Sequence, residues 1–320
     1  MTLGLKAFLR GITHHSGHHA DLPLVENSSF RAVPSHFDRP APDPVLPMDL
    51  ERYIFELAGW NDAKACSSLL LVAKRVYSWI FVLQHNILLF DAKNPIPKMQ
   101  HIITTRSREF LKANVKAVVF RVTTQADVVR FLNICKDVVH LALISDGSSF
   151  HMNSLGMYIL DLRPRSVSMH LVQAFDFSSS DLRIPFFSQL THLHLTDWPN
   201  EWSKLKLDNP QLFPELTHLA FTHWSHNPDH LALFDRILTK RLPLQELVLV
   251  VIWDGFKRPF GFSDKLMEDV RLVFMPIKDY VQDWHDFVAG GTQNMWSYAE
   301  QITWVRKEKR LLASQIKPRR

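Results

Sequence analysis

Seven short segments in which apolar and polar residues alternate recur between residues 115 and 275. Each has the pattern of a β-strand, and their first central apolar residues are Val118, Leu141, Met169, Leu193, Leu219, Leu247 and Leu272. Successive members of this set lie 23, 28, 24, 26, 28 and 25 residues apart. A period of this length holds one strand and one returning helix or loop, so the strands are predicted to stack side by side in parallel.

The stretches between these strands complete the repeat. Residues 126–136 and 229–242 have apolar residues at helical spacing. The period falls within the range of about 20 to 29 residues of leucine-rich repeats, although the asparagine ladder of their full consensus is absent. We therefore expect an α/β fold, with an irregular leucine-rich-repeat-like solenoid of parallel strands and helices over residues 91–290.

The alternation also predicts which side chains share a face of the sheet. If Leu193 and Leu195 point into the core, His192 and His194 point to the opposite face. The same alignment places three further histidines on that face: His140, His170 and His218. Because a solenoid usually binds its partner on the exposed face of its sheet, we expect these histidines to contact a partner.

Three interpretations of this histidine patch stay open. In the first, the patch becomes charged as the pH falls. In the second, it holds a metal ion. In the third, the histidines of a repeated Leu-Thr-His-Leu motif only satisfy local hydrogen bonds. The last interpretation needs no ligand, so we assign neither a metal nor a cofactor. Trp198 and Trp224, each just after a strand, are predicted to lie on one rim as further partner contacts, with packing onto the core as the alternative.

The first part of the chain differs in composition. Residues 1–44 are polar and rich in histidine and proline, without apolar periodicity, and predict a disordered leader. In a helix, four of its histidines would share one face and bind a divalent metal, whereas in a solvated tail they would not: His14, His15, His18 and His19.

Residues 45–90 predict a module of three short helices. Pro47 suits the first turn of a helix, Asp49 places negative charge at the positive end of its dipole, and Gly59 is expected to end it. A second helix follows, and a third is expected to run as far as Ile87. The module has too small a core to be very stable alone, so we expect it to lean on a partner or on the residues that follow.

The sequences LPMDLERYIFELAGW at 46–60 and LLLVAKRVYSWIFVL at 69–83 resemble an F-box, in the divergent form of the fungal F-box-like proteins. The sequence departs from the pattern at Asp49, where glutamate is usual, and at Ala73, where a small polar residue or cysteine is common. The resemblance implies that the Leu-Pro turn and the apolar helix faces dock on the Skp-type adaptor of a cullin–RING ubiquitin ligase. The docking residues that it implies are Leu46, Pro47, Leu50, Ile54, Leu70, Val72 and Trp79.

Degenerate repeats follow the F-box in many proteins of that family and form the substrate-selecting half. The resemblance therefore implies a substrate-recognition adaptor of an SCF-type ligase, a monomer within a complex whose partners are the Skp-type adaptor, the cullin ligase and a protein substrate. The alternative is a repeat-based interaction scaffold in which the helical module is only a cap. An exposed apolar face at Leu46 and Pro47 would favour the first function, and a buried turn the second.

Residues 291–320 predict a capping helix followed by a basic tail. The last 20 residues carry seven lysines and arginines and one acid, a charge of +6, so the other 300 residues of this +5 chain sum to −1. We expect the helix to close the end of the stacked sheet. Nuclear import, or binding to a membrane or nucleic acid, is the alternative for the basic residues, but the near-neutral body makes nucleic acid no expected partner.

Catalytic motifs are absent from the sequence. It holds no GxxxxGK, GxGxxG, GxSxG or HExxH pattern, and Cys135 stands among apolar residues as a core side chain. We expect no enzyme and no catalytic residue. Two cysteines in 320 residues indicate a reducing compartment, the cytoplasm or the nucleus, and no apolar stretch reaches the length of about 18 residues that a membrane span needs.

Overall fold

The computed structural model describes eleven ranges of the chain: 46–60, 63–90, 95–121, 124–144, 155–177, 184–207, 209–222, 228–239, 248–252, 264–277 and 279–316. The chain divides into two compact units, Met1–Leu83 and Gln84–Arg320. We call them the helical unit and the sheet unit. The predicted leader 1–44 and Trp224 lie outside the described residues.

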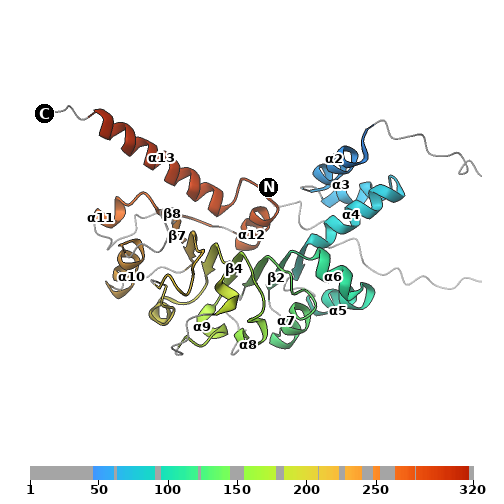
Figure 1. Ribbon diagram of the computed structural model, residues 1–320, viewed down its shortest axis with the longest axis horizontal. Coiled ribbons are helices and arrows are strands. Elements are labelled where there is room, and N and C mark those ends of the chain that lie inside the picture. Colours follow the sequence, from blue (N-terminus) through green and yellow to red (C-terminus); the bar gives the residue numbers. More distant parts are fainter. Residues whose placement is uncertain are drawn as a thin grey trace, which may run out of the picture. The chain divides into compact units, whose positions relative to one another are not determined.

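The helical unit contains the predicted short helices. These are α2 (Met48–Trp60), α3 (Ala63–Leu69) and α4 (Lys74–Asn86), whose last turn belongs to the sheet unit (Figure 1). Cys66, Val76 and Ile80 form the buried core of the unit. Six partly buried residues pack against it: Phe55, Leu69, Leu70, Ala73, Trp79 and Leu83.

Gly59 does not end the first helix, contrary to the sequence prediction. Helix α2 continues through Gly59 to Trp60. A Cβ at Gly59 would lie 3.2 Å from Cδ1 of Ile80 and 3.4 Å from Cδ2 of Leu83. The absence of a side chain at this position therefore lets α2 approach α4 closely, which is why a glycine stands inside the helix rather than after it.

The sheet unit is built on eight parallel strands that neighbour one another in chain order. The strands are β1 (Ile87–Phe90), β2 (Ala117–Arg121), β3 (His140–Ile144), β4 (Ser166–Met169), β5 (His192–Leu195), β6 (His218–Phe221), β7 (Val248–Ile252) and β8 (Leu272–Met275). All seven predicted strands are confirmed. The structure adds β1, because Ile87 pairs with Ala117 in register and is not the end of a helix.

The register corrects the predicted alignment of two strands. Val167, not Met169, pairs with Leu141 and Leu193, and Leu249 pairs with Leu219 and Leu272 in place of Leu247. The corrected intervals are 23, 26, 26, 26, 30 and 23 residues. Both errors were two residues long, so each strand kept its predicted faces, since side chains alternate with a period of two.

Helical segments return the chain between successive strands (Figure 1). They are α5 (Pro95–Thr105), α6 (Arg108–Asn114), α7 (Gln125–Leu132), α8 (Gly156–Ile159), α9 (Leu171–Ala174), η2 (Pro185–Phe187), η3 (Pro199–Lys204), α10 (Pro228–Thr239) and α11 (Asp264–Met267). The main core lies between the sheet and several of these segments and includes Leu193 and Leu195, as predicted. Phe131 of α7 and Trp202 of η3 are among its largest fully buried side chains.

Two C-terminal helices, α12 (Tyr280–Val288) and α13 (Met295–Ile316), pack on the opposite face of the sheet. Trp284 of α12 clusters with Ala117, Val119 and Ala142 of β2 and β3. Met295, Trp296 and Ala299 of α13 cluster with Ala220 of β6 and with Val273 and Met275 of β8. The sequence prediction placed the last helix at the end of the stack, whereas its first turns cover a face of the sheet.

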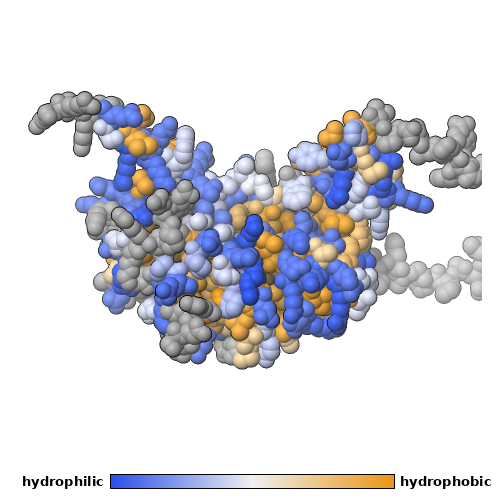
Figure 2. All heavy atoms as spheres, viewed as in Figure 1, coloured by the Kyte–Doolittle hydropathy of each residue, from blue (hydrophilic) through white to orange (hydrophobic). Residues whose placement is uncertain are grey.

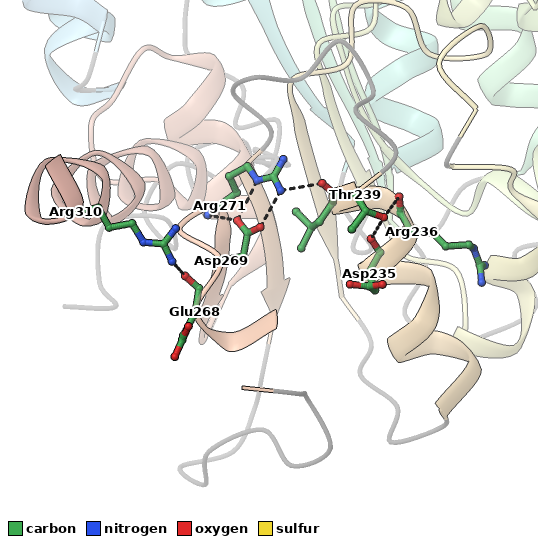
Figure 3. A network of polar contacts seen from close by, with 8 residues as sticks. Asp235, Arg236, Thr239, Glu268, Asp269, Arg271 and Arg310 are labelled. Atoms are coloured by element: carbon green, nitrogen blue, oxygen red, sulfur yellow. Dashed lines mark hydrogen bonds and ion pairs between the residues drawn. The ribbon is translucent and has the colours of Figure 1, made fainter. Parts of the chain in front are cut away.

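Arginine side chains attach α13 and the neighbouring strand β8 to surrounding backbone. Arg306 donates to the carbonyl oxygen of Leu272 over 2.6 Å, and Arg310 donates to that of Glu268. Arg271, just before β8, forms an ion pair of 2.7 Å with Asp269 and donates to the carbonyl of Leu238 at the end of α10 (Figure 3). Part of the basic C-terminal segment is therefore used in holding the fold.

The described residues contain no helix that is both long enough and apolar enough to cross a membrane.

Candidate functional site

The helical unit exposes a large amount of apolar surface for its size. Nine large apolar side chains within residues 46–83 are at least 45% exposed: Leu46, Met48, Leu50, Tyr53, Ile54, Leu57, Leu71, Val72 and Tyr77. Figure 2 shows hydrophobic residues at the surface of this unit. Leu50, Ile54 and Leu57 follow one another at the i, i+4, i+7 spacing that aligns side chains along one face of a helix. We call the nine residues the exposed apolar face.

Five of the seven docking residues that the resemblance implies lie at the surface: Leu46, Pro47, Leu50, Ile54 and Val72. Leu70 and Trp79 instead pack against the core of the unit, where Trp79 and Phe55 have ring centroids 6.4 Å apart. Tyr53 and Leu57 on the same helix are exposed as well, although neither is among the docking residues that the resemblance implies. Their spacing of three and seven residues from Leu50 was a readable signal for both.

An ion pair links the two longer helices of this unit. The Arg75 guanidinium on α4 donates to both carboxylate oxygens of Glu51 on α2, over 2.7 to 3.1 Å. This hydrogen bonding, with the negative charge of Glu51, raises the pKa of Arg75. Both groups reach solvent, so the pair adds little stability, but its fork geometry orients α2 and α4 relative to each other.

In the sheet unit, the strand register brings the predicted histidines into one row. His140 pairs with Ser166, Ser166 with His192, and His192 with His218. The imidazole rings of His192 and His218 stack with centroids 4.1 Å apart and an interplanar angle of 4°. The predicted equivalence of His140, His192 and His218 along the sheet is therefore confirmed.

The face that carries this row is not exposed, which corrects the predicted partner-binding surface. The ring of Phe287 on α12 lies 5.6 Å from that of His140 and 5.0 Å from that of His192, and Trp296 on α13 lies 5.6 Å from His218. His218 and His194 are only 8% and 6% exposed. Strand alternation predicts which side chains share a face, but not which distant helix covers it.

Local hydrogen bonds engage one ring nitrogen each of His192 and His218, in line with one of the three interpretations, and Nε2 of His218 lies 3.0 Å from a carboxylate oxygen of Glu300 on α13. Nδ1 of His218 lies 2.8 Å from the hydroxyl of Thr217, and that hydroxyl donates to the carbonyl oxygen of Thr191 in the preceding strand. Thr191 and His192 repeat the arrangement one repeat earlier. The side chains of the repeated Leu-Thr-His-Leu motif thus connect neighbouring strands.

Burial keeps His140 and His192 uncharged near neutral pH. It lowers the pKa of His140 to about 4, with a smaller contribution from the charge of Arg165. It lowers the pKa of His192 to about 3, with smaller contributions from His218 and His140. A patch that becomes charged on mild acidification is therefore not what the structure contains at these two positions.

Two further predicted residues lie at the carboxyl ends of the strands. His170 follows β4 and is the N-cap of α9, so it is not in the strand as predicted. Trp198 precedes η3 and is 53% exposed. His170 brings a ring nitrogen close to the carboxylates of Asp197 and Glu201, all within 4.8 Å of one another. Within the described part of the chain, these three side chains form a group that could hold a metal ion.

Cys135 is a core residue, as predicted. It is fully buried, and burial raises the pKa of its thiol to about 12, which leaves no thiolate for nucleophilic chemistry near neutral pH.

Comparison of the chain with protein-family models, curated proteins and solved structures finds no match to any of them. The exposed apolar face is thus the feature that points most directly to a function, because surfaces of this kind mark interaction sites.

Proposed function

We propose that the chain is the substrate-recognition subunit of an SCF-type cullin–RING ubiquitin ligase. In this proposal the helical unit is an F-box-like module that docks on a Skp-type adaptor. The sheet unit is an irregular leucine-rich-repeat-like solenoid that binds a protein substrate. Such a complex would operate in the cytoplasm or the nucleus.

The exposed apolar face is the observation that carries the proposal. Leu46, Leu50 and Ile54, which the F-box resemblance implies as docking residues, are 45%, 50% and 51% exposed. Removing a large apolar side chain from water contributes about 1.5 to 3 kcal/mol. A few such residues on one helix face therefore supply the buried centre that a stable interface needs.

The Leu46–Pro47 turn agrees with the ligase subunit. Both residues are exposed within the helical unit, next to the apolar stripe of α2, and are therefore available to an adaptor. Strand order in the sheet unit supports the second half of the proposal, because parallel strands that neighbour one another in chain order are the arrangement of a repeat solenoid.

Substrate contacts are assigned to the edge formed by the carboxyl ends of the strands. Helices α12 and α13 cover the histidine face, so that face does not meet a substrate while they are in place. Trp198 lies at the carboxyl end of β5 and is 53% exposed. Tryptophan is one of the residues that most often dominate the binding energy of an interface.

A pull-down with a purified Skp-type adaptor tests the proposal. The intact chain is compared with the double variant Leu46→Ala, Pro47→Ala and with Trp304→Ala, a control that truncates a side chain of the sheet unit with 62% exposure. Circular dichroism establishes that all three are folded. We expect retention of the intact chain and of Trp304→Ala and loss of the double variant. Absence of binding by the intact chain would overturn the proposal and leave the interaction scaffold.

A further inference from the structure

Three side chains with metal-ligating atoms converge at the carboxyl ends of β4 and β5. His170 directly follows β4, Asp197 lies two residues after β5, and Glu201 is in η3. One ligand atom from each lies within 4.8 Å of the others. The three residues come from neighbouring repeats, and only the stacking of the strands brings them together.

Asp197 is the residue of this group that the fold holds most firmly in place. It is fully buried, and its two carboxylate oxygens accept hydrogen bonds from the backbone N–H groups of Leu171 and Val172, over 2.9 and 2.8 Å. Its own carbonyl oxygen accepts from the indole N–H of Trp202 over 3.1 Å. Each carboxylate oxygen has a second lone pair, so these bonds orient the group without using up its capacity as a ligand.

Burial makes the ionised form of Asp197 costly. It raises the pKa of Asp197 to about 6, and the two backbone hydrogen bonds offset only part of this effect.

Glu201 and His170 are less confined than Asp197, and both are half-buried. Oε2 of Glu201 accepts a long hydrogen bond of 3.3 Å from the backbone N–H of Trp198, so its other oxygen can act as a ligand. Ligand atoms on a zinc ion lie about 2.0 to 2.2 Å from it. Two ligand atoms on one such ion lie at most about 4.4 Å apart, so the less confined Glu201 and His170 are the groups that would close the remaining distance.

We propose that His170, Asp197 and Glu201 form a binding site for a divalent transition-metal ion, for which Zn²⁺ is the natural probe. An imidazole nitrogen with two carboxylates suits such an ion, whereas Ca²⁺ and Mg²⁺ prefer oxygen ligands alone. Three protein ligands leave a fourth position open. The exposed Trp198 is the N-cap residue of the helix that carries Glu201, so the site lies on the strand-end edge. The site does not depend on the proposed ligase function.

The leader histidines must be removed from the experiment without truncating the chain. His14, His15, His18 and His19 are changed to alanine in the full-length protein, and this background serves for every measurement. Three variants are then made in it: His170→Ala and Glu201→Gln at the site, and His101→Ala as a control that removes an exposed histidine of α5. Asp197 is left unchanged because it holds two backbone N–H groups of the fold.

Co²⁺ and Zn²⁺ are titrated into each protein. Visible absorption of Co²⁺ reports direct coordination, Zn²⁺ competition gives the affinity, and circular dichroism verifies folding. We expect one equivalent to bind and the affinity to fall at least about tenfold in His170→Ala and Glu201→Gln, since even outer-shell changes cost about 10- to 100-fold. His101→Ala should match the background. Absence of stoichiometric binding, or equal affinity after His170→Ala, would overturn the proposal.

Discussion

The helical unit and the sheet unit differ in how much of their apolar side chains they bury. The helical unit buries a core of Cys66, Val76 and Ile80 and leaves nine large apolar side chains at least 45% exposed. The sheet unit has a core that reaches from Leu88 in β1 to Leu272 in β8, and it also covers the second face of its sheet with α12 and α13. For its size the helical unit therefore exposes more apolar surface than the sheet unit, whose exposed apolar residues, such as Trp198 and Trp304, belong to a much longer stretch of chain.

The largest effect that sharpens this comparison is expected in the sheet core. Phe131 is fully buried and meets Phe90 and Phe120 edge-to-face, with ring centroids 5.1 and 5.7 Å away. Phe131→Ala should lower the free energy of unfolding by about 3 to 5 kcal/mol, measured by urea denaturation. Tyr53→Ala, on the exposed apolar face, should change it by less than about 0.5 kcal/mol. Equal losses in the two variants would contradict the contrast.

A second effect concerns pH and the covered histidine face. The folded-state pKa values of His140 and His192 lie at about 4 and 3, below the ordinary value of 6.5. Their stabilising contribution is therefore complete above pH 6.5 and is lost as the pH falls toward 3. Asp197 and Asp283, whose pKa values burial raises to about 6, act in the opposite direction as the pH falls from 6 to 4.

The variant His192→Phe separates these contributions. A phenyl ring can stack on His218 but takes up no proton, so the variant should lose less stability than the native chain between pH 7 and pH 5. The difference is expected to be on the order of 1 to 3 kcal/mol. Urea denaturation at the two pH values measures it. Parallel pH dependence of the two proteins would show that His192 is not buried as described.

Part of the fold and of the candidate site could be predicted from the sequence. Seven strands were predicted because alternation is a local property, whereas β1 was missed because the apolar run Ile87–Phe90 also fits the end of a helix. The burial of the histidine row was not predictable, because Phe287 and Trp296 that cover it are far along the chain. The exposed apolar face was largely predictable, since α2 displays it at helical spacing. The grouping of His170 with Asp197 and Glu201 depends on strand register, which the sequence did not fix at β4.

A third prediction compares truncations on the exposed apolar face with one on the sheet unit. Ile54→Ala and Leu57→Ala should each weaken binding to a Skp-type adaptor by at least about tenfold, about 1.4 kcal/mol. Leu312→Ala, at a residue of α13 with 53% exposure, should leave the affinity unchanged. Surface plasmon resonance gives the three dissociation constants. A comparable loss of affinity in Leu312→Ala would contradict the assignment of the docking surface to the helical unit.

The smallest predicted effect concerns the Leu-Thr-His-Leu motif. Thr217→Val removes the hydroxyl that donates to the carbonyl oxygen of Thr191 and contacts His218. The expected loss of stability is about 0.5 to 1.5 kcal/mol. Thr239→Val removes an exposed hydroxyl that bonds within its own helix and should cost less. The reverse order in thermal unfolding would mean that the covered face gains nothing from these bonds.

The central claim is that the helical unit completes its core with a Skp-type adaptor. Isothermal titration calorimetry of the full-length chain with that adaptor tests it most directly. The account predicts a one-to-one complex with a negative heat-capacity change, the sign of buried apolar surface, and a loss of binding in the variant Leu46→Ala, Pro47→Ala. No heat of binding with the intact chain, or equal binding by the variant, would contradict it.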